Sequence, residues 1–158
     1  MNRVVIDASV VLKWYLVDEE LGPKALDLLD KYVSDDLDFL APSLLPYEVV
    51  NGLMIAQKRG RIEEKRILEA IEGFMGLGIK LKDLSLYYPR ALKFSQVHGR
   101  SAYDASYLAL AEEESAIFIR ADKTLFGNVK EELKWVKWLG DVRCLLKSHR
   151  HRAGFDPT

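Results

Sequence analysis

Four acidic residues lie beside apolar stretches of this sequence, where an unpaired negative charge is costly. Asp7 and Asp122 closely follow short apolar runs, and Glu48 and Asp104 fall in the first turns of two expected helices. Each acid alone has an ordinary explanation, because aspartate is common at strand ends and a carboxylate is favoured near a helix N-terminus. Four such acids brought together would repel one another, and a hard divalent cation removes that conflict.

Such a cluster predicts metal-dependent hydrolysis of a phosphodiester. Mg²⁺ or Mn²⁺ prefers oxygen ligands, can activate water and can stabilise the charge of an in-line displacement at phosphorus. The residues that we predict as metal ligands and as catalytic groups are Asp7, Glu48, Asp104 and Asp122. The predicted cofactor is Mg²⁺ or Mn²⁺.

Polar and basic residues border these acids and are candidates for contacts with substrate phosphates. They are Ser9, Arg100, Arg120 and Lys123. The basic members could instead form ion pairs with the acids, and this alternative stays open. The histidines are expected at the surface rather than as a general base: His98, His149 and His151.

Hydrophobic patterning predicts strands that alternate with helices. The expected strands are 4–6, 39–41, 79–81, 116–119 and 135–138. The expected helices run from a Ser9 cap to 16, then over 21–32, about 43–59, 62–77, 86–98, 102–114 after a Ser101 cap, and 141–147, with a helical turn at 123–126. This alternation predicts an α/β fold with a mainly parallel sheet flanked by helices. Sites in such sheets form beyond the carboxyl ends of strands, where the strand order reverses.

Composition limits the remaining possibilities. The chain has 158 residues, of which 49% are hydrophobic, and this suits one domain with a sizeable core. Its formal net charge is −1, so overall charge does not indicate a nucleic-acid binder. A single cysteine, Cys144, excludes an internal disulfide, and one cysteine with three histidines cannot make a Cys/His zinc site of the ordinary type. With neither a signal peptide nor an apolar stretch of membrane-spanning length, we expect a cytoplasmic protein.

Four segments in order resemble the motifs of PIN domains, and specifically of VapC-type toxins. The segments are 5–14, 46–53, 101–111 and 119–126, within a resemblance that covers roughly residues 3–145. The family's metal-binding acids fall on Asp7, Glu48, Asp104 and Asp122. The resemblance implies a three-layer α/β/α sandwich with a five-stranded parallel sheet, with residues 1–147 forming the PIN domain and 148–158 a polar tail. It also implies an endoribonuclease that hydrolyses RNA, a homodimer, and a small VapB-type antitoxin as partner. We place the groove for an antitoxin segment at the helices around Leu53 and Ile67.

One departure from the family pattern leaves other functions open. The family often has Thr or Ser two residues before the fourth acid, whereas this chain has Arg120. Ser9, near the first acid, could partly supply the missing hydroxyl. Arg120 favours a catalytically weak PIN domain that only binds RNA or protein, while the intact acids argue against it. A receiver-like domain that accepts a phosphoryl group is a third possibility, although two of the acids lie on helices rather than at strand ends.

Overall fold

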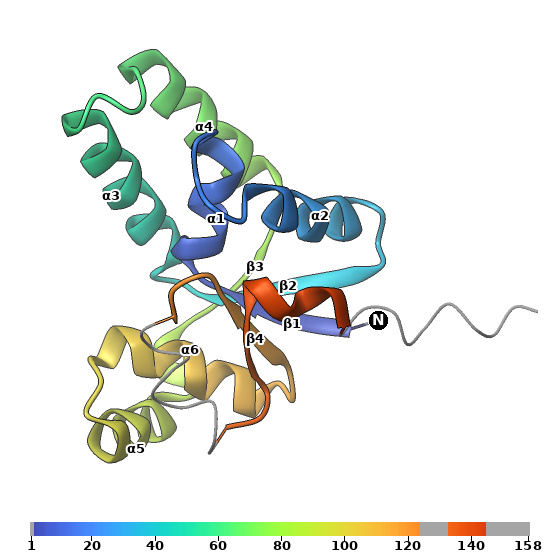
Figure 1. Ribbon diagram of the computed structural model, residues 1–158. Helices are drawn as coiled ribbons and strands as arrows, with labels where there is room; N and C mark the ends of the chain where they lie inside the picture. Colours follow the sequence, from blue (N-terminus) through green and yellow to red (C-terminus); the bar gives the residue numbers. More distant parts are fainter. Residues whose placement is uncertain (1, 124–132, 145–158) are drawn as a thin grey trace, which may run out of the picture.

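The fold is built around a five-stranded, fully parallel sheet, as the sequence predicts (Figure 1). The computed structural model describes residues 2–123 and 133–144. The strands are β1 (Asn2–Ile6), β2 (Leu37–Pro42), β3 (Lys80–Lys82), β4 (Ile117–Arg120) and β5 (Val136–Trp138). Their order is β3-β2-β1-β4-β5. Receiver-like folds have the order β2-β1-β3-β4-β5, so this topology rules out the receiver-like alternative.

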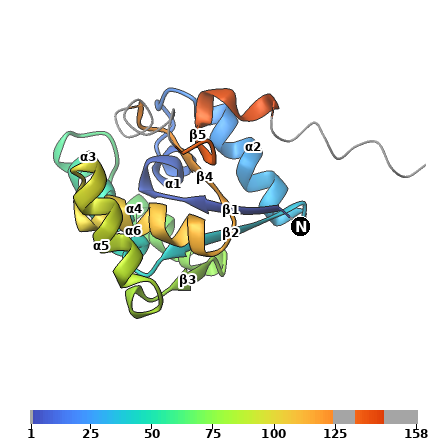
Figure 2. The same cartoon turned by 90° about the horizontal axis from the view of Figure 1, so that it is seen from below.

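Helices cover both faces of the sheet and give the three-layer α/β/α sandwich (Figures 1 and 2). One face carries α1 (Ala8–Tyr15), α2 (Gly22–Val33), α3 (Leu45–Lys58), α4 (Glu64–Gly76) and the 3₁₀ helix η2 (Leu139–Cys144). The other face carries α5 (Tyr88–His98) and α6 (Ala102–Glu113), preceded by the short 3₁₀ helix η1 (Leu84–Leu86). Because both faces are covered, each central strand contains an apolar run: residues 4–6 of β1, 39–41 of β2 and 117–119 of β4. Within β1, Val4 and Ile6 pack into the first layer and Val5 into the second.

Helix α6 lies deep in the second layer, as its Ala-rich sequence predicts. Its residues 105–111 are all buried, because the helix is enclosed between the sheet and α5. Ser101 caps it, since the Ser101 hydroxyl accepts a hydrogen bond from the backbone N–H of Asp104 at 3.1 Å. This cap fixes the first turn of α6, and with it the position of Asp104.

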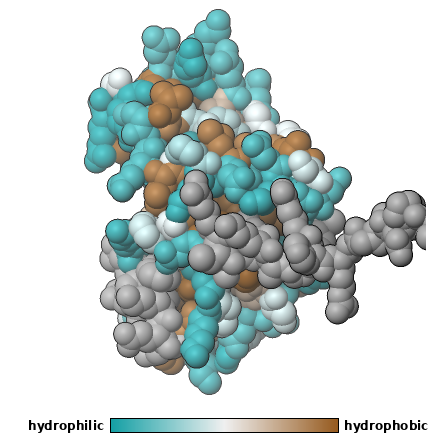
Figure 3. Space-filling view, turned by 45° about the vertical axis from the view of Figure 1, so that its right-hand side comes forward, coloured by the Kyte–Doolittle hydropathy of each residue, from teal (hydrophilic) through white to brown (hydrophobic). Residues whose placement is uncertain are grey.

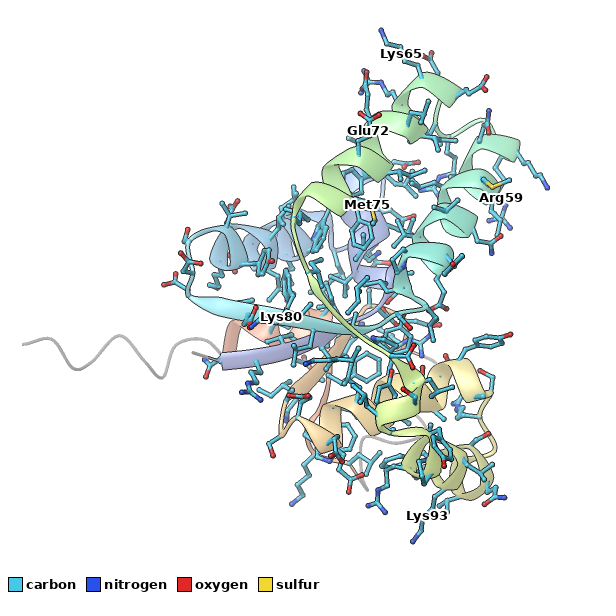
Figure 4. All side chains as sticks on the ribbon, turned by 180° about the vertical axis from the view of Figure 1, so that it is seen from behind. Arg59, Lys65, Glu72, Met75, Lys80 and Lys93 are labelled. Atoms are coloured by element: carbon cyan, nitrogen blue, oxygen red, sulfur yellow. The ribbon has the colours of Figure 1, made fainter. Side chains whose placement is uncertain are left out.

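The two sides of the sheet differ in how far they extend. In Figure 4, α3 and α4 form a hairpin that projects away from the sheet, with Arg59 and Lys65 near its far end, while Lys93 marks α5 on the opposite side.

The face drawn in Figure 3 is mostly hydrophilic, with separate apolar patches in its upper part. None of the helices within the described ranges is both long and apolar enough to cross a membrane.

Three expected helix boundaries are wrong. Asp7, not Ser9, caps α1, because the Asp7 carboxylate accepts from the backbone N–H of Ser9 at 3.0 Å. The helix expected over 86–98 begins only at Tyr88, since Pro89 lacks the N–H that a continuous helix needs and can stand only in the first turn of a helix; Leu86 instead ends η1. The last helix expected over 141–147 is a 3₁₀ helix that begins at Leu139, and 145–147 lie outside the described residues. Most of the turn expected at 123–126 and the whole tail 148–158 also lie outside them.

The strand order reverses between β1 and β4, at the centre of the sheet. From β1 the chain proceeds to β2 and β3 on one side, and β4 is followed by β5 on the other. Ile6 pairs with Ile119 in register, so the two strands end side by side. Asp7 follows β1, and Asp122 follows β4 by two residues. The topology therefore places both aspartates at the position where parallel α/β sheets form their sites.

Candidate active site

A single guanidinium, that of Arg120, lies among three of the four predicted acids. Its Nε lies 2.8 Å from Asp7 Oδ2, its Nη1 3.2 Å from Asp104 Oδ1, and its Nη2 3.7 Å from Asp122 Oδ2. The three carboxylates come from the N-cap of α1, the first turn of α6 and the segment after β4. Residues separated by more than a hundred positions in the sequence thus converge on one positive charge.

Asp7 is the most buried of the acids, with only 4% of its surface exposed. The Ser9 hydroxyl donates to Asp7 Oδ1 at 2.5 Å and accepts from the backbone N–H of Ala121 at 3.0 Å, so Ser9 links the start of α1 to the segment after β4. Burial raises the pKa of Asp7, and the charge of Asp104 adds to this, while Arg120 and the Ser9 hydrogen bonds oppose it. Arg120 and Ser9 therefore offset only part of the cost of burying the negative charge of Asp7, since its pKa remains raised.

Glu48 lies in the first turn of α3 and is held by Tyr107 of α6. The Tyr107 hydroxyl donates to Glu48 Oε1 at 2.5 Å. Burial raises the pKa of Glu48, the Tyr107 hydrogen bond lowers it, and the charges of Asp7 and Asp104 raise it further. Glu48 is therefore close enough to Asp7 and Asp104 for their negative charges to act on it.

Sequence reasoning missed the role of Tyr107. The ring of Tyr107 is buried and stacks on Phe118 of β4, with centroids 5.6 Å apart. The signal was available, since Tyr107 follows Asp104 by three residues and lies on the same side of α6. An inward-facing acid at Asp104 should have predicted an inward-facing hydroxyl one turn later.

The predicted substrate contacts occupy different environments. Ser9 orients Asp7, and Arg120 makes the ion pairs that the sequence left open as an alternative. Arg100 lies half-buried between α5 and α6, where its backbone carbonyl accepts from the Ser95 hydroxyl. Lys123 is exposed, and its Nζ lies 4.3 Å from the centre of the Trp138 ring. Asp122 is the most open of the three acids around Arg120, with 45% of its side chain exposed.

The donor set suits a hard divalent cation, but the acids are not closed around one. Mg²⁺ and Mn²⁺ prefer carboxylate oxygens, and the oxygens of Asp7, Asp104 and Asp122 already face a common positive charge. Across residues 2–123 and 133–144, however, no three acidic, histidine or cysteine side chains are close enough together to hold one ion. The physical reason is Arg120, whose planar group spaces the oxygens around itself.

Comparison with known proteins identifies the fold and the family. A model of the PIN domain matches residues 4–132. Ribonuclease VapC3 of Pyrobaculum aerophilum is 29% identical over 126 residues, which cover 78% of this chain and 92% of that protein. The crystal structure of PAE2754 from Pyrobaculum aerophilum has a TM-score of 0.64 at 19% identity and covers 92% of this chain and 89% of that one. A chain in the structure of VapBC2 from Rickettsia felis, bound to a DNA fragment from their promoter, has a TM-score of 0.57 at 11% identity and covers 86% and 96% of the two chains. Because the matched segment contains all four acids and spans most of the sequence, the chain belongs to the PIN domain family, and its relatives include VapC-type proteins, as the resemblance predicts.

Proposed function

We propose that this chain is an endoribonuclease that depends on Mg²⁺ or Mn²⁺. The observation that carries the proposal is the convergence of Asp7, Asp104 and Asp122 on one cation at the point where the strand order reverses, with Glu48 held beside them. The similarity to a relative named Ribonuclease VapC3 supports RNA as the substrate.

The residues proposed to hold the ion are Asp7, Glu48, Asp104 and Asp122. A divalent cation bound there would supply a Lewis acid that activates water and stabilises the charge of the leaving oxygen. Ser9 fixes the orientation of the Asp7 carboxylate, and Tyr107 fixes that of Glu48. Burial of Asp7 and Tyr107 keeps water from that side of the site, which strengthens the pull of the carboxylates on a cation.

RNA cleavage by the Asp104→Asn variant tests this function. Asparagine keeps the shape of the side chain but removes a negative charge, so we expect cleavage to fall by about a hundredfold or more. A matched control is Asp27→Asn, because Asp27 is an exposed aspartate that pairs with Lys31 on the far helix α2. We expect this control to cleave as the wild type does, and we expect EDTA to stop cleavage that Mg²⁺ or Mn²⁺ then restores. Equal activity in Asp104→Asn, or activity that is indifferent to EDTA, contradicts the proposal.

We further propose that the protein is the toxin of a type II toxin–antitoxin pair in the cytoplasm, that it is a homodimer, and that a VapB-type antitoxin binds it. The structural similarity to VapBC2 of Rickettsia felis supports the antitoxin. Leu53 and Ile67 are themselves buried, so a bound segment would contact the open flank formed by α1, the turn after it and α4, which includes Trp14, Val17 and Arg66. Co-purification with the product of a short adjacent reading frame tests the pairing. Retention of that product after this flank is made polar contradicts the placement.

A PIN domain that binds RNA or protein without cleaving it is a second candidate. The observation that favours it is Arg120, which fills the space among the acids where a metal ion is expected. The two candidates differ in whether a divalent ion can enter against Arg120.

A further inference from the structure

Arg120 contacts the same oxygens that a divalent cation would need. Each of its three nitrogens faces a different carboxylate, and only 14% of its side chain is exposed. The N–O distances are 2.8, 3.2 and 3.7 Å, whereas Mg²⁺ requires oxygens at about 2.1 Å. The carboxylates can therefore close on such an ion only if the guanidinium leaves.

Arg120 is held more by charge than by directional hydrogen bonds. Its Nε is buried and lies close to Asp7 Oδ2, yet it makes no hydrogen bond, and it is the one buried side-chain atom of this kind in the described part of the chain. Among the described residues, only Nη1 has a hydrogen-bond partner of ordinary geometry, Asp104 at 3.2 Å. A group held in this way can be displaced by an ion with a higher charge density.

The charges around Arg120 favour that exchange. One guanidinium carries a single positive charge, whereas the four carboxylates of Asp7, Glu48, Asp104 and Asp122 carry up to four negative charges. Lys123 is close to the site in sequence, but its ammonium lies over the Trp138 ring. A divalent ion would neutralise more of the cluster than Arg120 does.

We propose that Arg120 is a built-in counter-cation that competes with the divalent metal for the carboxylates of Asp7, Asp104 and Asp122. It stabilises the metal-free protein and lowers the affinity of the site for metal. When metal enters, the guanidinium moves off the carboxylates while it keeps its charge. This inference rests on the metal site of the proposed function.

Mn²⁺ binding to the full chain tests the competition. The Arg120→Gln variant removes the competing charge, so we expect calorimetry to give a dissociation constant about tenfold lower, or lower still, than that of the wild type. Arg120→Lys keeps one positive charge but cannot span three carboxylates, and we expect an intermediate affinity. Lys123→Gln is the matched control, because it removes the same charge next to the site from a side chain that contacts a ring instead of the acids. We expect its effect on Mn²⁺ affinity to be under about threefold.

A second measurement follows Arg120 itself. In ¹⁵N NMR spectra, the arginine Nε–H signal that disappears in Arg120→Lys belongs to this side chain. We expect Mg²⁺ to shift that signal in the wild type in proportion to binding. If Arg120→Gln is unfolded without metal, this signal and Arg120→Lys still decide the question.

The outcomes separate the inference from the proposed function. Mn²⁺ affinity that is no tighter in Arg120→Gln, an equal gain in Lys123→Gln, or an Nε signal that stays unmoved at saturating Mg²⁺ overturns the competition. If the wild type nevertheless cleaves RNA in a metal-dependent way, the proposed nuclease function is retained and only the proposed competition by Arg120 is rejected. Tighter Mn²⁺ binding by Arg120→Gln, together with no cleavage by the wild type, supports the competition and overturns the nuclease.

Discussion

Two clusters in this molecule each gather acids around one arginine. In one cluster the pKa of Asp18 and Glu19 is lowered. In the other cluster the pKa of Asp7 and Glu48 is raised. In the loop ion-pair network (Lys13, Asp18, Glu19 and Arg61), Arg61 Nη2 lies 2.9 Å from Asp18 and 2.8 Å from Glu19, and Lys13 also binds Glu19 at 3.1 Å. Hydrogen bonds from Arg61 lower the pKa of Asp18. Burial would raise the pKa of Glu19, but Arg61 and Lys13 lower it overall.

The acid site (Asp7, Glu48, Asp104, Asp122 and Arg120) behaves in the opposite way. Burial raises the pKa of both Asp7 and Glu48 in spite of Arg120. In the loop ion-pair network two cations bind two acids, whereas Arg120 lies among three acids, with Glu48 nearby. The difference teaches that ion pairing alone does not mark a functional site. A partly buried cluster in which the pKa of acids stays raised despite an ion pair does, because a further cation would stabilise the carboxylates there.

The largest expected effect on stability comes from removing each arginine in metal-free buffer. Arg120→Ala leaves Asp7 buried without its partner, so we expect the free energy of unfolding to fall by about 3 kcal/mol. Arg61→Ala disturbs exposed pairs, which contribute little to stability, so we expect a much smaller loss than for Arg120→Ala. Urea unfolding measures both values.

Added salt sharpens this contrast. Salt screens exposed charges but not buried ones, so about 1 M NaCl should abolish the Arg61 effect and leave most of the Arg120 effect. Equal losses for the two variants at both salt concentrations would show that the two clusters do not differ in the way described.

A smaller effect is expected at the hydrogen bond that holds Glu48. Tyr107→Phe keeps the ring on Phe118 but removes the hydroxyl that donates to Glu48. We expect the free energy of unfolding to fall by about 1–2 kcal/mol, because Glu48 loses a charge-assisted hydrogen bond in a buried setting. The control is the same substitution in a Glu48→Gln background, where the loss should be smaller. An identical loss in both backgrounds would show that the hydroxyl does not act through Glu48.

The sequence predicts the fold and the proximity of Asp7, Asp104 and Asp122, because both depend on strong local signals. Short β-branched runs between amphipathic segments lead to a parallel sheet, and acids that interrupt apolar stretches need a common explanation. Helix α6 is an example: its Ala-rich sequence predicts that it is buried, and the Ser101 cap fixes where it begins. Together these two signals place Asp104 at the site.

The parts that the sequence does not predict depend on side-chain direction across elements. Arg120 ends β4, and nothing in its neighbourhood tells whether it turns outward to a substrate or inward to Asp7. The same holds for Ser9, whose hydroxyl joins α1 to the segment after β4 through Ala121. Local patterns encode which face of a strand is buried, but the partner of a polar group at a strand end is decided by segments far away in the sequence.

The smallest expected effect is also the most direct test of the comparison, because it has a different sign in the two clusters. The pKa of Glu48 in the folded protein is raised above its ordinary value of 4.5, so the folded state holds its proton more tightly than the unfolded state. The free energy of unfolding therefore falls as pH rises from about 4.5 through the folded pKa, and Glu48→Gln should gain stability relative to the wild type over that window. The pKa of Asp18 is lowered from 3.8, so its contribution is fully present above that pH and is lost as pH falls through the folded pKa. Asp18→Asn should accordingly lose stability relative to the wild type as pH rises through the acid range.

Urea unfolding of the wild type and the two variants between about pH 3 and pH 7 measures how the free energy of unfolding of each protein changes with pH. If the stability of the two variants relative to the wild type changed with pH in the same direction, the carboxylates of the acid site would be neutralised as fully as those of the loop ion-pair network. In that case the acid site would not favour a further cation.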